Sequence, residues 1–154
     1  MAEKLTHIRI VGAGLIGTSI GLALKGAGVK VSIRDSEARA EALARDLLDD
    51  LDDENLSLEQ LCIVATPPEV IAHVVAEELS RNPGLRVMDV SSIKTKPLLD
   101  ISKTSLDAAF FAPTHPMAGR EVSGPESARG DLFIGRPWVL TSEGVDPSLL
   151  AHVK

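Results

Sequence analysis

Residues 12–17 have the sequence Gly12-Ala13-Gly14-Leu15-Ile16-Gly17, and this stretch decides the fold. It joins an apolar run over residues 7–13, which predicts a buried strand, to a run over residues 15–25, which predicts a helix. In such a unit the first glycine permits a tight turn, the second lets the backbone approach a diphosphate, and the third lets the helix pack closely on the sheet. The helix N-terminus adds free N–H groups and a partial positive charge. All six residues are therefore candidates for binding the diphosphate of a dinucleotide.

The second predicted strand, over residues 29–34, ends at Arg34 and Asp35, about 20 residues after the glycine stretch. A carboxylate at this place accepts hydrogen bonds from the hydroxyls of the adenosine ribose and repels a 2′-phosphate. Arg34 acts in the opposite sense, since a guanidinium beside the ribose would accommodate a phosphate or stack on the adenine. We therefore expect NAD as the cofactor, with NADP as the less favoured alternative.

Ala65, Thr66 and Pro67 follow a later apolar strand and are the remaining cofactor candidates. An open α/β sheet places its ligand-contacting loops at the carboxyl ends of its strands, and this segment is such a loop. A turn that the prolines merely stiffen is the structural alternative, and the two interpretations are compatible.

Strand-like and helix-like segments alternate along the chain, which is typical of an α/β domain with a parallel sheet. We expect residues 1–154 to form one Rossmann-type domain, with a doubly wound, mostly parallel sheet and helices on both faces. Further strands are predicted over residues 61–66, 86–90, 109–112 and 137–141, and further helices over residues 37–48, 67–81 and 97–105 and from residue 147 onward.

The composition limits the classes of protein. The 154 residues, of which 44% are hydrophobic and 25% charged, suit one globular domain with a substantial core. A formal net charge of −6 disfavours a nucleic-acid partner. Cys62 is the single cysteine, which excludes an intrachain disulfide, and its apolar neighbours predict a buried thiol in a protein of the reducing cytoplasm.

For two further segments we expect no functional site. The uncharged run over residues 10–24 is shorter than the roughly 20 residues of a membrane span and is interrupted by glycines, so neither a membrane segment nor a signal peptide is expected. The acidic stretch over residues 46–54 is predicted to be a solvated helix end and loop, because no His or Cys lies nearby to shape a metal site.

Two later motifs are more distinctive than a general nucleotide-binding fold requires. They are Asp89-Val90-Ser91-Ser92-Ile93-Lys94 and Thr114-His115-Pro116-Met117-Ala118-Gly119-Arg120-Glu121, the second followed by Ser123-Gly124. Both motifs resemble those of the prephenate and arogenate dehydrogenase family, and the resemblance extends from the glycine stretch to residues 138–141. It implies an NAD-dependent enzyme of tyrosine biosynthesis that oxidatively decarboxylates prephenate to 4-hydroxyphenylpyruvate. Arogenate is the alternative substrate.

By this resemblance His115 matches the catalytic histidine, which takes the proton of the substrate's 4-hydroxyl. The chemistry agrees, because hydride loss from a carbinol builds positive charge that a base on the hydroxyl relieves, and histidine is largely neutral and basic near pH 7. Ser92 matches the serine that hydrogen-bonds the same hydroxyl or the histidine. Ser91 stands where the family usually has glycine, so either serine is a candidate for the substrate, and helix capping before residue 95 is the alternative for both.

Arg120 and Glu121 are candidate rim residues of the substrate pocket, since the family places substrate-contacting residues there. Arg120 replaces the threonine of many members, and a surface ion pair is the alternative for the two side chains. Structural or surface roles are expected for the other histidines and for three further charged residues, which are His7, His73, His152, Asp89, Lys94 and Asp131.

The resemblance also implies a helical second domain after residue 154, which would supply a homodimer interface and an arginine for a substrate carboxylate. We expect this chain alone to bind the dinucleotide but to catalyse poorly. Two other hypotheses are an imine or 3-hydroxyacid reductase on the same fold, against which the motif around His115 argues, and a dinucleotide-binding module without catalysis.

Overall fold

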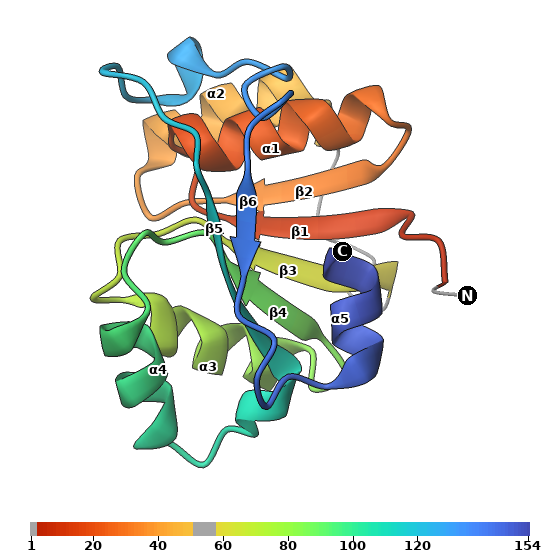
Figure 1. The fold of residues 1–154 in the computed structure, drawn as a ribbon. Coiled ribbons are helices and arrows are strands. Elements are labelled where there is room, and N and C mark those ends of the chain that lie inside the picture. The colour runs from red at the N-terminus through yellow and green to blue at the C-terminus, as the bar shows by residue number, and fades with distance from the viewer. Residues whose placement is uncertain (1–2, 51–57) are drawn as a thin grey trace.

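The computed structural model describes residues 3–50 and 58–154. Strands and helices alternate in it as the sequence predicts (Figure 1). The strands are β1 (His7–Val11), β2 (Lys30–Arg34), β3 (Leu61–Val64), β4 (Arg86–Asp89), β5 (Phe111–Pro116) and β6 (Trp138–Leu140). The helices are α1 (Leu15–Gly26), α2 (Ala38–Leu48), α3 (Ile71–Arg81), α4 (Thr95–Ser102) and α5 (Pro147–Val153), with short 3-10 turns η2 (Ala108–Phe110) and η3 (Pro125–Ser127).

The strands form one sheet in the order β2-β1-β3-β4-β5-β6, parallel except for the antiparallel pair β5–β6. Because β1 to β5 are parallel, their carboxyl ends lie at one edge of the sheet, and the strand order changes direction there between β1 and β3. This is the place where doubly wound sheets bind ligands. The predicted Rossmann-type fold is confirmed.

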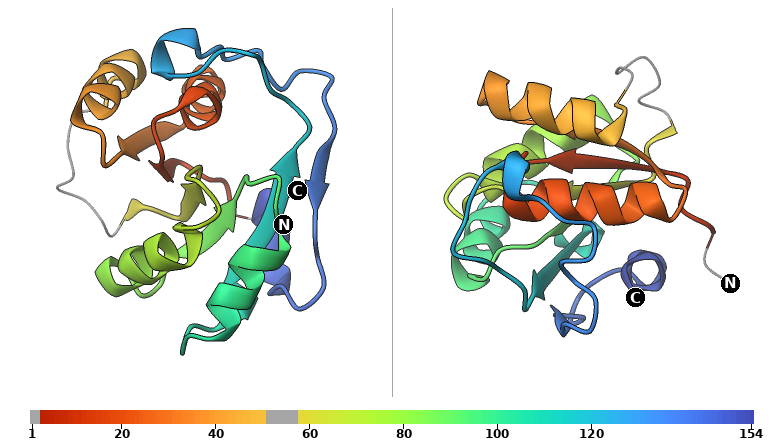
Figure 2. Two further views of the ribbon diagram at one scale, coloured as in Figure 1. Left: turned by 90° about the vertical axis from the view of Figure 1, so that its left-hand side faces the viewer. Right: turned by 90° about the horizontal axis from the view of Figure 1, so that it is seen from above.

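Apolar side chains cover both faces of the sheet, because successive residues of a strand point to opposite sides. In β3, Ile63 joins the core under α1 and α5, whereas Cys62 joins the core under α3 and α4. Helix α2 packs on β2 and against α1, as the views in Figure 2 show. Cys62 is fully buried as predicted, and burial raises the pKa of its thiol.

Helix α3 begins at Ile71 rather than at the two prolines, which corrects the predicted boundary. A residue before proline is pushed away from helical backbone angles, so Thr66 and Pro67 both resist the helix. The segment forms a turn instead, in which the Val70 N–H donates to the Pro67 carbonyl at 3.2 Å.

The predicted strand over residues 109–112 is displaced, because β5 runs over Phe111–Pro116 and residues 108–110 form η2. Beyond Pro113 the strand pairs with β6 alone, in register His115 to Val139. Proline lacks the N–H that pairs neighbouring strands and normally indicates the end of a strand. Because of Pro113 and Pro116, the sequence did not predict that the strand continues to residue 116. His115 therefore lies in a strand, beyond the end predicted for that strand at residue 112.

The acidic stretch over residues 46–54 is only partly solvated, and its residues 51–54 lie outside the described part of the chain. Asp49 is exposed and pairs with Lys25 at 2.7 Å. Asp50 is buried, with its side chain 3% exposed, and forms ion pairs with Arg34 and Arg45. The prediction of a solvated segment is therefore wrong for Asp50.

Over residues 3–50 and 58–154, no three His, Cys, Asp or Glu side chains lie where they would hold a metal ion. None of the described helices has the length and apolar character that crossing a membrane requires.

Candidate functional site

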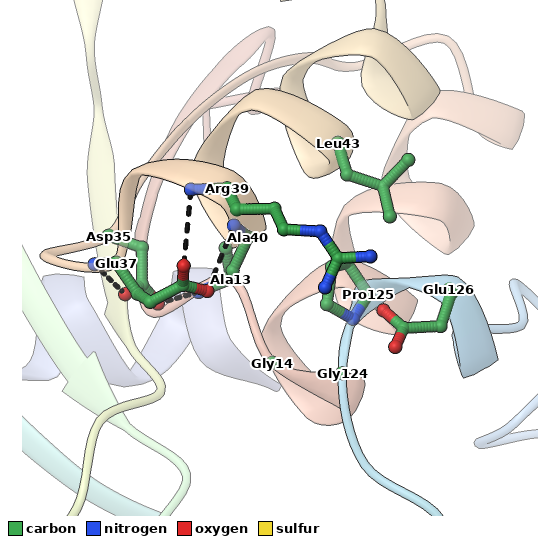
Figure 3. A pocket seen from close by; sticks show the side chains of 10 residues that line it. All are labelled: Ala13, Gly14, Asp35, Glu37, Arg39, Ala40, Leu43, Gly124, Pro125 and Glu126. Carbon is green, nitrogen blue, oxygen red and sulfur yellow. Dashed lines mark hydrogen bonds between the residues drawn. The ribbon is translucent and has the colours of Figure 1, made fainter.

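A cavity of about 630 Å³ lies between the carboxyl ends of β1, β2 and β3 and helix α3. Most of the predicted cofactor residues border it, which are Gly12, Gly14, Arg34, Asp35, Ala65, Thr66 and Pro67. A second cavity of about 230 Å³ lies between the start of α2 and η3 (Figure 3). Gly14 and Asp35 border both cavities, so the two cavities meet at the glycine loop.

The three glycines of the loop have different roles. Gly12 has φ of +112°, and a Cβ there would lie 2.3 Å from the Ala65 carbonyl oxygen. A Cβ on Gly17 would lie 1.9 Å from the Gly12 carbonyl oxygen. These two glycines therefore allow close packing of β1, α1 and β3. Gly14 differs, because a Cβ there would meet no atom within 4 Å. It would only fill the open space beside the Gly14 backbone, which we call the cradle.

Helix α1 begins immediately after Gly14, and no side chain caps its N-terminus. The first N–H groups of a helix have no partner within it, so an uncapped start beside a cavity suits an anion. Ala13 and Leu15 are buried, and Ile16 packs against the core. These three residues can therefore contribute to a ligand through the backbone rather than through their side chains.

The Asp35 carboxylate is tied to the glycine loop. Its Oδ2 accepts a hydrogen bond of 2.6 Å from the Ala13 N–H, and its Oδ1 accepts one of 2.8 Å from the Glu37 N–H (Figure 3). The Asp35 N–H donates to Glu41 Oε2 at 2.7 Å. Each carboxylate oxygen keeps a lone pair after these bonds, so Asp35 can still accept from two ribose hydroxyls.

Thr66 has a buried hydroxyl, and within the described residues Oγ1 has no hydrogen-bond partner. Buried polar groups normally have a partner, and an orphan in a cavity wall suits a ligand that supplies one. With the open cradle at Gly14 and the Asp35 carboxylate, the residues present fit a dinucleotide.

The second cavity contains residues that the sequence analysis missed. Arg39, Leu43 and the segment Gly124–Glu126 line it, and Arg39 extends across it toward Glu126 (Figure 3). These segments are far apart in sequence and meet because the chain after β5 folds back over α1 and α2. Gly124 was named in the sequence analysis only as part of the family motif, and its positive φ of +85° and its place in a cavity wall were not predicted.

His115 and the two serines lie at the carboxyl ends of the neighbouring strands β5 and β4. The His115 ring is partly buried, and its Nδ1 has no hydrogen-bond partner among the described residues. Ser91 Oγ accepts a hydrogen bond of 3.2 Å from the Ile93 N–H. Ser92 is exposed, and no hydrogen bond of the described structure joins it to His115. The Ser91 hydroxyl thus accepts a hydrogen bond within its own turn, whereas the Ser92 hydroxyl makes none among the described residues.

Neither serine caps the following helix. Helix α4 begins at Thr95, and its N-cap is Lys94, which makes no side-chain capping bond. The capping alternative for Ser91 and Ser92 is therefore wrong.

Asp89 links the two segments that carry the predicted catalytic residues. It is fully buried at the end of β4. Its carboxylate accepts hydrogen bonds from Lys94 Nζ at 2.6 Å, from the Thr114 N–H at 3.1 Å and from the Ser91 N–H at 3.2 Å. Burial raises the pKa of Asp89 against the opposing effect of Lys94, and burial lowers the pKa of Lys94. Asp89 and Lys94 thus have the structural roles that the sequence predicted: Asp89 joins β4 to β5 beside His115, and Lys94 pairs with Asp89.

The Asp89→Asn variant is expected to lower the free energy of unfolding by about 1–3 kcal/mol. The amide leaves Lys94 without its charged partner and places an N–H₂ group where only acceptors fit. Urea denaturation of this chain measures the loss. Asp131→Asn is the control, because Asp131 is 53% exposed and its ion pair is with Arg129, which is 57% exposed, so its effect stays within about 0.5 kcal/mol. Equal effects of the two substitutions would contradict the role given to Asp89.

The structure does not bring Arg120 and Glu121 to the cavities at the glycine loop. Both are exposed, and Arg120 donates to the Ser127 carbonyl at 3.2 Å. No ion pair between the two occurs in the described structure, so the ion-pair alternative is wrong. Arg120 instead borders a separate polar cavity of about 220 Å³ with Arg129 and Arg136.

The glycine loop, the carboxylate after β2 and the cavities between them define a nucleotide-binding domain of the Rossmann type. A model of the prephenate dehydrogenase nucleotide-binding domain matches residues 20–154, and the chain belongs to this family. The resemblance that the sequence motifs indicated is confirmed.

Three relatives illustrate the family. NovF, a probable prephenate dehydrogenase of Streptomyces niveus, is 38% identical over 142 residues, which cover 92% of this chain and 39% of that protein. A cyclohexadienyl dehydrogenase of Zymomonas mobilis is 30% identical, over 92% of this chain and 51% of that protein. The crystal structure of Synechocystis arogenate dehydrogenase matches with a TM-score of 0.79 and 30% identity, over 96% of this chain and 54% of that one. The chain spans about half, or less, of the length of these relatives.

Proposed function

We propose that this chain is the NAD-binding half of a dehydrogenase that converts prephenate to 4-hydroxyphenylpyruvate by oxidative decarboxylation. The observation that carries the proposal is the Asp35 carboxylate, held 2.6 Å from the Ala13 N–H of an open glycine loop and still able to accept from a ribose. Family membership supports the substrate class, because NovF is named a probable prephenate dehydrogenase. Arogenate is the alternative substrate, supported by the likeness to Synechocystis arogenate dehydrogenase.

The residues at the strand ends divide the work of binding. Backbone N–H groups at the start of α1 would hold the diphosphate beside Gly14, where no Cβ stands in the way. Asp35 would accept from the two hydroxyls of the adenosine ribose, and Thr66 Oγ1 would gain a partner from the ligand. NAD, when bound, supplies the acceptor for the hydride that leaves the substrate.

His115 would act as the base. As the hydride leaves C4 of the substrate ring, His115 takes the proton of the 4-hydroxyl, so that a carbonyl forms there instead of an isolated cation. The bond to the ring carboxylate then breaks and carbon dioxide departs. The electron pair of that bond completes the aromatic ring, and the former carbonyl oxygen takes back a proton to become the hydroxyl of the product. Ser92 would hydrogen-bond the same hydroxyl and orient it. Positioned acid–base catalysis of this kind contributes roughly 10²- to 10⁴-fold in rate.

The remainder of the active site is proposed to lie in a second domain. The relatives are about twice as long as this chain or longer, which leaves room for a domain that binds a substrate carboxylate and forms a dimer interface. This chain alone would then bind NAD and turn over poorly.

Two measurements test the proposal. Calorimetric titration of NAD and NADP into this chain is expected to give tighter binding of NAD. The two-domain enzyme, assayed with prephenate and arogenate side by side, is expected to reduce NAD with release of carbon dioxide. Absence of NAD binding, or turnover of neither substrate, would overturn the proposal.

The Asp35→Ser variant is expected to weaken NAD by about tenfold or more relative to NADP, because it removes both ribose acceptors and the charge that repels a 2′-phosphate. The ratio of the two dissociation constants measures the effect. It is more informative than either constant, since Asp35 also holds the glycine loop and its loss weakens both ligands. Glu37→Gln serves as the control and is expected to leave the ratio unchanged, because Glu37 caps α2 and lines the smaller cavity rather than the larger one. An unchanged ratio in Asp35→Ser would show that the carboxylate does not select the cofactor.

A further inference from the structure

Arg34 is a cation in the wall of the proposed adenosine site. It borders the same cavity of about 630 Å³ as Asp35, its neighbour at the end of β2. A guanidinium is the side chain that best matches a phosphate, through paired charge-assisted hydrogen bonds. The position of Arg34 alone would therefore favour NADP, against the preference set by Asp35.

The structure holds this guanidinium on Asp50. Arg34 Nη1 lies 2.6 Å from Asp50 Oδ2 and also donates to the Ile33 carbonyl at 2.6 Å. Asp50 Oδ2 accepts a second hydrogen bond, of 2.9 Å, from the Ile33 N–H, and Arg45 Nε lies 3.6 Å away. The Asp50 side chain is 3% exposed and that of Arg34 is 15% exposed. Asp50 is thus fixed to the β2 backbone by the Ile33 N–H and pairs there with the Arg34 guanidinium.

We propose that Asp50 is a specificity-determining residue, which excludes NADP by holding the Arg34 guanidinium away from a 2′-phosphate. To reach the phosphate, Arg34 would have to leave a buried carboxylate, and a buried charge that loses its partner is strongly destabilising. NADP therefore meets the Asp35 carboxylate without the compensating cation. The inference rests on the proposed binding of NAD at this site.

The Asp50→Asn variant tests the proposal on this chain. The asparagine oxygen can still accept from the Ile33 N–H, but the neutral amide no longer binds the guanidinium as a carboxylate does. The dissociation constant of NADP divided by that of NAD is expected to fall roughly tenfold, the effect of one charge-assisted hydrogen bond to the phosphate. Using the ratio cancels any general loss of affinity that a looser β2 causes.

Two matched variants test whether the change in the ratio is due to Asp50 and Arg34. Asp49→Asn removes the adjacent carboxylate, which is 72% exposed and pairs with Lys25, and is expected to leave the ratio unchanged. Adding Arg34→Ala to Asp50→Asn is expected to return the ratio to its original value, because the released cation is then missing. A gain for NADP that survives this double substitution would overturn the proposal.

Crystals of the unchanged chain soaked in NADP give a readout that does not depend on how Asp50 variants fold. Arg34 is expected to remain on Asp50, with the 2′-phosphate left without the guanidinium. A guanidinium that has turned onto the phosphate would overturn the proposal, as would an unchanged ratio in folded Asp50→Asn. If the unchanged chain binds neither dinucleotide, the proposed function fails and takes this inference with it. If NAD binds and only the ratio fails to move, the proposed function stands.

Discussion

Replacing His115 by asparagine in the two-domain enzyme is expected to lower kcat by about 10²-fold or more while the affinity for NAD changes little. Asparagine keeps a polar side chain but cannot take a proton near neutral pH. His115 lies on β5, and it borders neither of the two cavities at the glycine loop. Its loss therefore removes the proposed base and leaves the proposed NAD site intact.

Steady-state turnover of prephenate, together with calorimetric NAD binding, measures both halves of this prediction. His7→Asn is the matched control, since His7 lies at the amino end of β1, on the opposite edge of the sheet, and both its turnover and its NAD affinity are expected to be unchanged. Full turnover of His115→Asn would show that the histidine is not the base. Loss of NAD binding together with turnover would show that His115 acts on the fold of the cofactor site instead.

The glycine stretch made the first half of the domain predictable from sequence. Its demands are local, since a tight turn, an uncapped helix start and a close helix–sheet contact involve residues near one another in the chain. The structure shows this close contact: a Cβ on Gly17 would lie only 1.9 Å from the Gly12 carbonyl oxygen, so α1 packs against the loop with no room for a side chain. Strand and helix boundaries in this half agree within a few residues.

The second half was less predictable because its pairing is not local. The extension of β5 through His115 depends on β6, a partner that begins at Trp138. Two prolines argue against a strand at this place. The strand nevertheless continues, because after Pro113 it pairs with β6 on one side and with no strand on the other. A missing proline N–H therefore costs little there.

Side-chain networks between distant segments were the largest omission. Asp50 appeared to be one acid among several in a solvated stretch, yet its contacts with Arg34 and the Ile33 N–H bury it. Asp89 likewise serves two segments, since Ser91 and Thr114 both donate to it. Composition indicates that charges are present, but the pairing of a given carboxylate depends on the fold.

Gly14→Ala and Gly17→Ala are expected to fail in different ways, although both belong to one motif. At Gly14 the backbone angles, φ −81° and ψ −165°, suit alanine, and the new methyl group meets no atom within 4 Å. The melting temperature should therefore be unchanged, whereas NAD should bind about tenfold or more weakly because the methyl group occupies the cradle of the diphosphate. At Gly17 the methyl group would lie 1.9 Å from the Gly12 carbonyl oxygen, so β1 and α1 must separate.

Forcing that separation is expected to cost about 3 kcal/mol or more of unfolding free energy, at the upper end of overpacked cores, and to remove NAD binding with it. Gly26→Ala, at the end of the same helix, is the matched control, since its methyl group would meet nothing within 4 Å and lies far from both cavities. Thermal unfolding and NAD titration of the three variants separate the two roles. A Gly14→Ala variant that binds NAD normally would show that no diphosphate approaches this backbone, and a Gly17→Ala variant of normal stability would show that the close contact of β1 and α1 is not required.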